Sequence, residues 1–291
     1  MNPKPSTHSR YRASAIAAAG ASEAFVSSAE VARVYDRMVA DYDKIDEEAF
    51  YHNQYRAYRR HLDENRDRLR GHLLDIGCGT GLQVAICKPL VAEVTGVDIS
   101  EGLLEEARRK LPDVHFINAD ACKLPFPDCS FDTVISYGEV FSHIPDYRVA
   151  FREAVRVLRP GGFFMFSVLN KWNIRTLLRP KELCLALRGR EGHLRKWECV
   201  INSQGERVSL PLKTFGKHEL LDLARDSGLE ILDVRGLHIL SLLVPLTLQY
   251  ATMNFWGRCF VTLGKMDEAL TMTRLLPHFG YTKLLVTQRK P

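Results

Sequence analysis

Three glycines and an aspartate form the part of this chain that is best suited to hold a ligand. Gly77, Gly79 and Gly81 occupy alternate positions after the apolar run 72–76. Asp75 precedes the first glycine by two residues. Glycine has no side chain to keep a ligand away from the main chain. A short strand, a glycine turn and a helix place a ligand at the carboxyl end of the strand, so the pattern predicts a site for a nucleoside-type cofactor.

The spacing and the acid distinguish between two kinds of cofactor. A dinucleotide fingerprint has the spacing G-x-G-x-x-G and directs a helix N-terminus at a pyrophosphate. Here the spacing is G-x-G-x-G, and position 82 is Leu. The carboxylate of Asp75 would repel a pyrophosphate but attract the ammonium of an amino-acid-bearing cofactor. S-adenosylmethionine carries that ammonium and no phosphate, so the loop favours it over NAD.

Two further acids end neighbouring predicted strands. Asp98 closes the segment 93–98, and Asp120 closes the segment 114–120. A carboxylate at a strand end can accept hydrogen bonds from both ribose hydroxyls of a nucleoside. One such Asp alone is as consistent with a turn or a helix N-cap as with a ligand contact. Three acids at nearly even spacing favour a common site.

The sequence around these acids resembles a known family. The run 73–100, Leu124-Pro-Phe-Pro-Asp128 after Asp120, and Arg156-Val-Leu-Arg-Pro-Gly-Gly162 are similar to the class I S-adenosylmethionine-dependent methyltransferases of the UbiE or type-11 kind. The resemblance implies S-adenosylmethionine as cofactor and a methyl transfer as the reaction. It says almost nothing about the methyl acceptor.

The resemblance also implies roles for individual residues. The methionine part of the cofactor would be held by Asp75 and by the loop residues Gly77, Cys78, Gly79, Thr80 and Gly81. Asp98 would hold the ribose, and Ile99 would pack on the adenine ring. Asp120, with the backbone of Ala121, would bind the adenine amino group.

A helix before the first strand is expected to cover this site. Ser27-Ser-Ala-Glu30 has the capping-box pattern, and apolar side chains recur on one helical face over 31–42. Tyr35 and Tyr42 belong to a Tyr-Asp repeat similar to that of related methyltransferases, which implies an N-terminal lid over the cofactor. A helix that only packs on the core is the alternative. We expect the lid to occupy 27–70 and to follow a disordered tail, 1–26.

The remaining segments alternate between strand and helix patterns, which predicts a doubly wound, mostly parallel sheet with helices on both faces. Strands are expected at 72–77, 93–98, 114–119, 131–137, 162–168, near 229–234 and near 284–287. By resemblance this is the seven-stranded Rossmann-like methyltransferase fold with an antiparallel last strand. The cofactor-binding core would span 71–170, and 216–291 would complete the sheet.

The segment 136–145 follows the fourth strand and should face the transferred methyl group. Methyl transfer from a sulfonium is an in-line displacement, so alignment in a water-depleted pocket supplies much of the catalysis. A base is needed only if the acceptor must lose a proton, and His143 and Glu139 are the candidates. His143 could equally pack against or cap the next helix. Tyr137 and Phe141 would line the pocket, Tyr137 on the cofactor side and Phe141 on the substrate side.

Two segments go beyond the minimal fold. The insert 171–215 begins with a stretch, 171–196, that has eight Lys and Arg against two Glu, and Arg175 and Arg179 are candidate contacts for an anionic group of the acceptor. The run 236–257 has no charged residue, although its polar residues and Pro245 argue against a membrane span. Together they predict an acceptor that is a small or medium-sized, partly hydrophobic metabolite. A lipid or prenylated acceptor at an anionic membrane surface is the alternative, and for each segment so is a purely structural role.

The composition excludes some classes of protein. The net charge of +5 includes Lys4, Arg10 and Arg12 of the tail, so charge alone does not indicate a nucleic-acid partner. The seven cysteines form no C-x-x-C pair, which favours reduced thiols in the cytoplasm over disulfides or a metal site. A non-catalytic protein that binds S-adenosylmethionine is the alternative from another class. The oligomeric state stays open.

Overall fold

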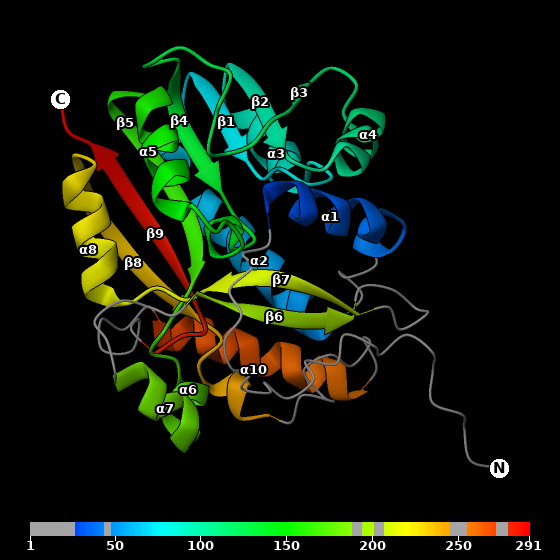
Figure 1. Cartoon of the computed structure of the whole chain (residues 1–291), viewed down its shortest axis with the longest axis vertical. Helices are drawn as coiled ribbons and strands as arrows, with labels where there is room; N and C mark the ends of the chain where they lie inside the picture. Colours follow the sequence, from blue (N-terminus) through cyan, green and yellow to red (C-terminus); the bar gives the residue numbers. More distant parts are fainter. Residues whose placement is uncertain (1–26, 44–47, 188–193, 201–206, 245–254, 272–278) are drawn as a thin grey trace.

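The computed structural model describes residues 27–43, 48–187, 194–200, 207–244, 255–271 and 279–291. Its main sheet has seven strands in the order β3-β2-β1-β4-β5-β9-β8. Their bounds are β1 (His72–Ile76), β2 (Glu93–Asp98), β3 (His115–Asn118), β4 (Phe131–Ser136), β5 (Leu158–Leu169), β8 (Leu229–Leu237) and β9 (Thr282–Arg289). Strands β1 to β5 pair in parallel, and β9 is antiparallel to both β5 and β8. The predicted fold is therefore confirmed (Figure 1).

Helices cover both faces of this sheet. On one face, α5 (Tyr147–Val157) and α8 (Lys217–Asp226) pack into a core that includes Phe164 and Phe166 of β5. On the other face lie α2 (Ala49–Glu64), α3 (Leu82–Cys87) and α4 (Glu101–Lys110). Since both faces are buried, the central strands can be apolar along their whole length, which is why their sequences read as continuous hydrophobic runs.

Two elements cross the carboxyl ends of the strands. The helix α1 (Ser28–Tyr42) begins with the predicted capping box, because Ser27 N–H donates to Glu30 Oε2 at 2.7 Å and Glu30 N–H donates to Ser27 Oγ at 3.3 Å. A hairpin of β6 (Leu194–Val200) and β7 (Arg207–Lys213) lies beside it. Val208 and Leu210 of β7 pack against the apolar face of α1. The helix and the hairpin thus form one layer at the edge where parallel strands end (Figure 1).

The rest of the additional material lies on the far side of the hairpin in Figure 1. It comprises α6 (Ile174–Leu178), α7 (Pro180–Leu187), the short 3-10 helix η5 (Leu240–Leu243) and α10 (Phe255–Thr271), which packs on α2. The tail 1–26 and the segment 245–254 of the uncharged run lie outside the described residues. No helix in the described part of the chain is long and apolar enough to span a membrane. Nor do the described His, Cys, Asp and Glu residues form a group that could hold a metal ion.

One strand boundary differs from the sequence prediction. The fifth strand was expected at 162–168, but β5 begins at Leu158 and includes Pro160-Gly161-Gly162. The register with β4 shifts there, since Phe131 faces Leu158 whereas Thr133 faces Phe163. Gly161 has a φ of 74°, which glycine adopts without strain. The extra residues form an irregular bulge within the strand.

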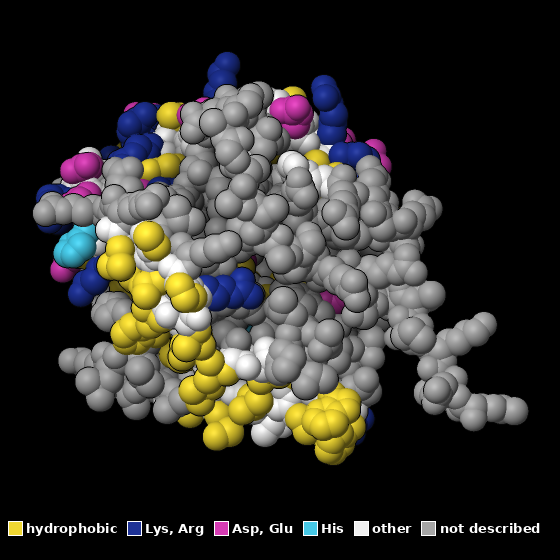
Figure 2. All heavy atoms as spheres, turned by 60° about the horizontal axis from the view of Figure 1, so that its bottom comes forward, with side chains coloured by type: hydrophobic (Ala, Val, Ile, Leu, Met, Phe, Trp, Pro, Cys, Tyr) yellow, Lys and Arg dark blue, Asp and Glu magenta, His cyan; other side chains and the backbone are white. Residues whose placement is uncertain are grey.

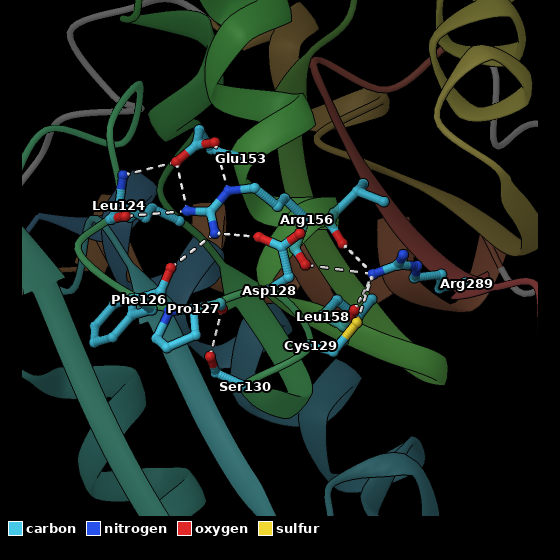
Figure 3. A network of polar contacts seen from close by, with 11 residues as sticks. Leu124, Phe126, Pro127, Asp128, Cys129, Ser130, Glu153, Arg156, Leu158 and Arg289 are labelled. Atoms are coloured by element: carbon cyan, nitrogen blue, oxygen red, sulfur yellow. Dashed lines mark hydrogen bonds and ion pairs between the residues drawn. The ribbon is translucent and has the colours of Figure 1, made fainter.

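An arginine network joins α5 to the loop before β4 (Figure 3). The Arg156 guanidinium donates to the carbonyl oxygens of Phe126 at 2.7 Å and Leu124 at 3.1 Å, and to Asp128 at 2.8 Å. It also forms two 2.8 Å bonds with Glu153, whose second oxygen accepts from Leu124 N–H at 2.9 Å. The Arg156 guanidinium lowers the pKa of Glu153. Arg156 and Glu153 of α5 therefore hold the loop that leads into β4.

We expect Arg156→Ala to lower the free energy of unfolding by about 1–3 kcal/mol, because two carbonyl groups and two carboxylates lose their donor. Arg152 is exposed on the same helix, so Arg152→Ala should change the stability by less than about 0.5 kcal/mol. Urea unfolding of both variants measures the difference. Equal midpoints would show that the network does not stabilise the loop.

Candidate cofactor and acceptor site

A pocket opens at the carboxyl ends of β1, β2 and β4. It encloses about 760 Å³ of empty space, part of which is open to solvent. The strand ends form its floor, α1 covers it, and the segment 137–145 after β4 forms one wall. Of the residues predicted for the site, the pocket lining brings together Tyr35, Tyr42, Gly77, Asp98, Ile99, Asp120, Ala121, Tyr137 and His143.

The glycine loop is packed so closely that side chains would not fit. A Cβ at Gly77 would lie 2.4 Å from Cγ2 of Val140, and Gly77 has a φ of 73°. At Gly79, with a φ of 53°, a Cβ would lie 3.3 Å from the hydroxyl oxygen of Tyr42. Gly81 precedes α3 with a φ of 86°. Backbone conformation and close approach together explain why three glycines are present.

Asp98 is buried at the end of β2 and anchors the loop. Its Oδ2 accepts from Gly79 N–H at 2.8 Å, and its Oδ1 accepts from Ser100 N–H at 2.9 Å. Burial raises the pKa of Asp98, and these backbone bonds oppose that effect. The residue also lines the pocket, so one carboxylate holds the loop and faces the ligand space.

Asp75 lies behind the glycine loop with an unsatisfied oxygen. It is 1% exposed and does not line the pocket, but the next residue, Ile76, does. Its Oδ2 has no hydrogen-bond partner in the described part of the chain. Burial, and to a lesser extent Asp98, raise the pKa of Asp75. An unpaired buried carboxylate is costly, and an ammonium group would satisfy it. The unpaired carboxylate of Asp75 therefore fits the ammonium group of S-adenosylmethionine.

The lid helix is tied to the core through the aspartates of the Tyr-Asp repeat. Ser100 Oγ donates to Asp36 Oδ1 at 2.6 Å, and Thr80 Oγ1 donates to Asp43 Oδ1 at 2.8 Å. Tyr35 and Tyr42 face the pocket, and burial raises the pKa of Tyr42. Asp36 and Asp43 were not among the residues predicted for the site, although their seven-residue spacing, two helical turns, was a signal for a common face.

Glu139 lies outside the pocket lining, in a buried polar network. It accepts from Gln54 Nε2 at 2.8 Å and 2.9 Å, from the Tyr58 hydroxyl at 2.5 Å and from Thr282 Oγ1 at 3.0 Å. Its N–H donates to Ser167 Oγ at 3.0 Å. Burial raises the pKa of Glu139, and the donated bonds oppose the shift. Its carboxylate is used within the fold, so the structure does not place it as a base at the pocket.

Two predicted substrate contacts, Phe141 and Arg179, also lie away from the pocket. Phe141 is 1% exposed and packs edge-on against Phe151 and Phe164 in the core. Arg179 is exposed between α6 and α7 and is not part of the pocket lining. The side chain of Arg175 is outside the described part of the structure. Arg179 therefore does not form the positive rim that the sequence predicted around the pocket.

His143 lies in the pocket wall with a defined tautomer. Its Nδ1 is 2.9 Å from the carbonyl oxygen of Pro211 in β7. A carbonyl only accepts, so we assign the proton to Nδ1, and Nε2 carries the lone pair of the neutral ring. Burial lowers the pKa of His143, which keeps the ring neutral. Tyr137 on the same segment has its hydroxyl 2.8 Å from His61 Nδ1 of α2.

Known proteins resemble this chain in both sequence and fold. A methyltransferase domain family matches residues 74–166. An uncharacterised protein of Methanocaldococcus jannaschii is 32% identical over 212 residues, which cover 70% of this chain and 78% of that protein. The demethylmenaquinone methyltransferase of Staphylococcus haemolyticus is 35% identical over 144 residues, 47% of this chain and 59% of that enzyme. The chain thus matches less than two thirds of that enzyme's length.

A solved structure described as a DhpI-SAM-HEP complex shares the fold, with a TM-score of 0.58 and 18% identity over 93% of this chain and 100% of that one. The sheet order, the strand-end acids, the glycine loop and these relatives agree. The chain belongs to the class I S-adenosylmethionine-dependent methyltransferases.

Proposed function

We propose that this enzyme methylates a small or medium-sized, largely apolar metabolite, and that His143 removes the proton from the accepting oxygen, nitrogen or carbon. The observation that carries the proposal is the Nδ1 bond from His143, a residue of the pocket lining, to the carbonyl of Pro211. The same lining includes the apolar side chains of Val31, Tyr35, Val140, Ile144 and Pro145, which we propose form the acceptor corner. The Staphylococcus relatives are named for a quinone-type acceptor, which agrees with an apolar substrate.

In this proposal three acids bind different parts of the cofactor. Asp75 would accept from the cofactor's ammonium, Asp98 would accept from its ribose hydroxyls, and Asp120 would accept from the adenine amino group. Ile99 would pack on the adenine ring. S-adenosylmethionine supplies a methyl group on a positively charged sulfur when it is bound.

The chain's own contribution to the transfer is alignment and proton removal. Tyr35 and Tyr42 exclude water beneath α1, which favours the in-line displacement because the positive charge is consumed as the new bond forms. His143 Nε2 accepts the acceptor's proton while Nδ1 stays bonded to Pro211. Glu139 acts as a positioning residue: through Gln54, Tyr58 and Thr282 it holds the turn that carries Tyr137 and Val140.

The acceptor class is tested by incubating the purified chain with methyl-labelled S-adenosylmethionine and a metabolite extract. We expect a labelled product that partitions into the organic phase, because the acceptor corner is apolar. Label confined to the aqueous phase would contradict the apolar acceptor. Cofactor binding without any labelled product would instead favour a non-catalytic protein.

Asp98→Asn tests the cofactor half. The substitution removes the charge that strengthens hydrogen bonds to the ribose hydroxyls, so we expect S-adenosylmethionine affinity to fall by about 30-fold or more. Calorimetry gives the dissociation constant, and circular dichroism checks the fold because Asp98 also bonds Gly79. Asp226→Asn at the end of α8 is the matched surface control. Unchanged affinity in Asp98→Asn would exclude Asp98 from ribose binding.

His143→Asn separates the base from a structural histidine. The Asn amide can still donate to Pro211 but has no basic nitrogen in place of Nε2, so we expect kcat to fall by about 10²–10⁴-fold with cofactor affinity unchanged. Activity that survives in His143→Asn would assign His143 a structural role.

The wild-type pH profile gives a second test of His143. Its pKa is lowered from 6.5, so the neutral, basic form is lost only as the pH falls below that value. We expect kcat/KM to decline only on that acidic side. An acid limb centred above pH 6.5 would belong to a different group.

A further inference from the structure

We propose that the face formed by α6, α7, η5 and α10 docks on the surface of an anionic lipid bilayer. Of the ten large apolar side chains that are exposed in the described part of the chain, seven lie on these four elements. They are Leu177, Leu178, Leu187, Leu243, Phe255, Trp256 and Met266. Such a concentration of exposed apolar side chains marks an interaction surface, whereas isolated ones are ordinary.

The four elements share one side of the molecule. The short helix η5 packs against both α6 and α10, so the exposed side chains form a continuous area. Figure 2 shows this area as a band of hydrophobic side chains across the lower face of the molecule. It includes two aromatic rings in contact with each other, those of Phe255, which is 71% exposed, and Trp256, which is 56% exposed. Aromatic side chains of this kind favour the boundary between lipid headgroups and acyl chains.

The helix α10 presents two different faces. Phe260 and Val261 are buried against Phe50 of α2. Asp267 is also buried, where it accepts from the N–H groups of Ile239, Leu240 and Ser241. Phe255, Cys259, Thr262 and Met266 recur on the outside at helical spacing and are exposed. The inner face thus fixes the helix to the fold, and the outer face is available for a partner.

The charges on this face select the kind of partner. Arg258 and Lys265 of α10 are exposed beside the apolar stripe, and Arg179 is exposed between α6 and α7. Lys and Arg side chains accompany the hydrophobic band in Figure 2. Asp267 of α10 is buried, and the side chains of Glu182 and Glu268 are outside the described part of the structure. The exposed basic side chains beside the apolar ones complement an anionic lipid surface.

The test is sedimentation of the full chain with vesicles of phosphatidylcholine, alone or with 30% phosphatidylglycerol, at low and high salt. We expect the wild-type chain to bind the anionic vesicles and to be released by salt. Each basic residue near an anionic surface strengthens binding by about fivefold, so Arg258→Glu with Lys265→Glu should lower the partition coefficient at least about 25-fold. Phe255→Ala with Trp256→Ala should also reduce binding, including the part that resists salt.

A control variant shows whether a loss of vesicle binding is specific to the face formed by α6, α7, η5 and α10. Leu221 on α8 and Leu232 on β8 are exposed elsewhere, and their double Ala variant should bind vesicles like the wild type. Circular dichroism of every variant confirms that it is folded. The proposal fails if the wild type does not bind anionic vesicles, or if the face variants bind as well as the control. It also fails if the face variants change only the oligomeric state in size-exclusion chromatography, because a second copy would then be the occupant.

Discussion

The pair of backbone hydrogen bonds accepted by the buried carboxylate of Asp98 is the interaction on which the site depends. One bond holds Gly79 of the glycine loop, and the other holds Ser100 at the start of α4. Ser100 in turn donates to Asp36 of the lid helix. A buried charge is tolerated only when it is well hydrogen-bonded, so the loop, the helix and the strand end are constrained together. The lid is attached to the same point.

The insert after β5 contributes to the site in a way that its composition did not indicate. Its charges suggested a basic rim, but the described part of the insert that contacts pocket residues is β7. The carbonyl of Pro211 bonds His143, and Val208 and Leu210 form the apolar seat of α1. A single hairpin therefore orients the histidine and supports the lid. In the described chain, the exposed basic and apolar residues of α6, α7 and α10 lie on a separate face.

The turn after β4 is held by residues that do not line the pocket. Glu139 has a φ of 56° and sits in a turn beside Gly138. Four donated hydrogen bonds from Gln54, Tyr58 and Thr282 hold it there. The turn also carries Val140, which packs against Gly77. Helix α2 and β9 therefore set the shape of the pocket wall formed by the segment 137–145, even though neither lines the pocket.

The sequence by itself determined the cofactor half of this protein. The strand patterns, the alternate glycines and the strand-end acids can each be recognised from residues that are close together in the sequence. Because parallel strands bring their carboxyl ends to one edge of the sheet, these local patterns also predict that their residues meet there. For that reason the sequence could place Gly77 and Asp98 at the strand-end pocket, with Asp75 two residues before the glycine loop. The register irregularity at Gly161 could not, because it depends on pairing with β4.

Only the tertiary structure decided the acceptor half. The tautomer of His143 depends on the carbonyl of Pro211, 68 residues further along the chain. Glu139 lies outside the pocket because it bonds Gln54 and Thr282, which are 85 and 143 residues away in the sequence. Phe141 was predicted to line the pocket, but its ring packs against Phe151 in the aromatic core. Such contacts arise from packing between elements that are distant in sequence, so they cannot be predicted from residue type and local spacing.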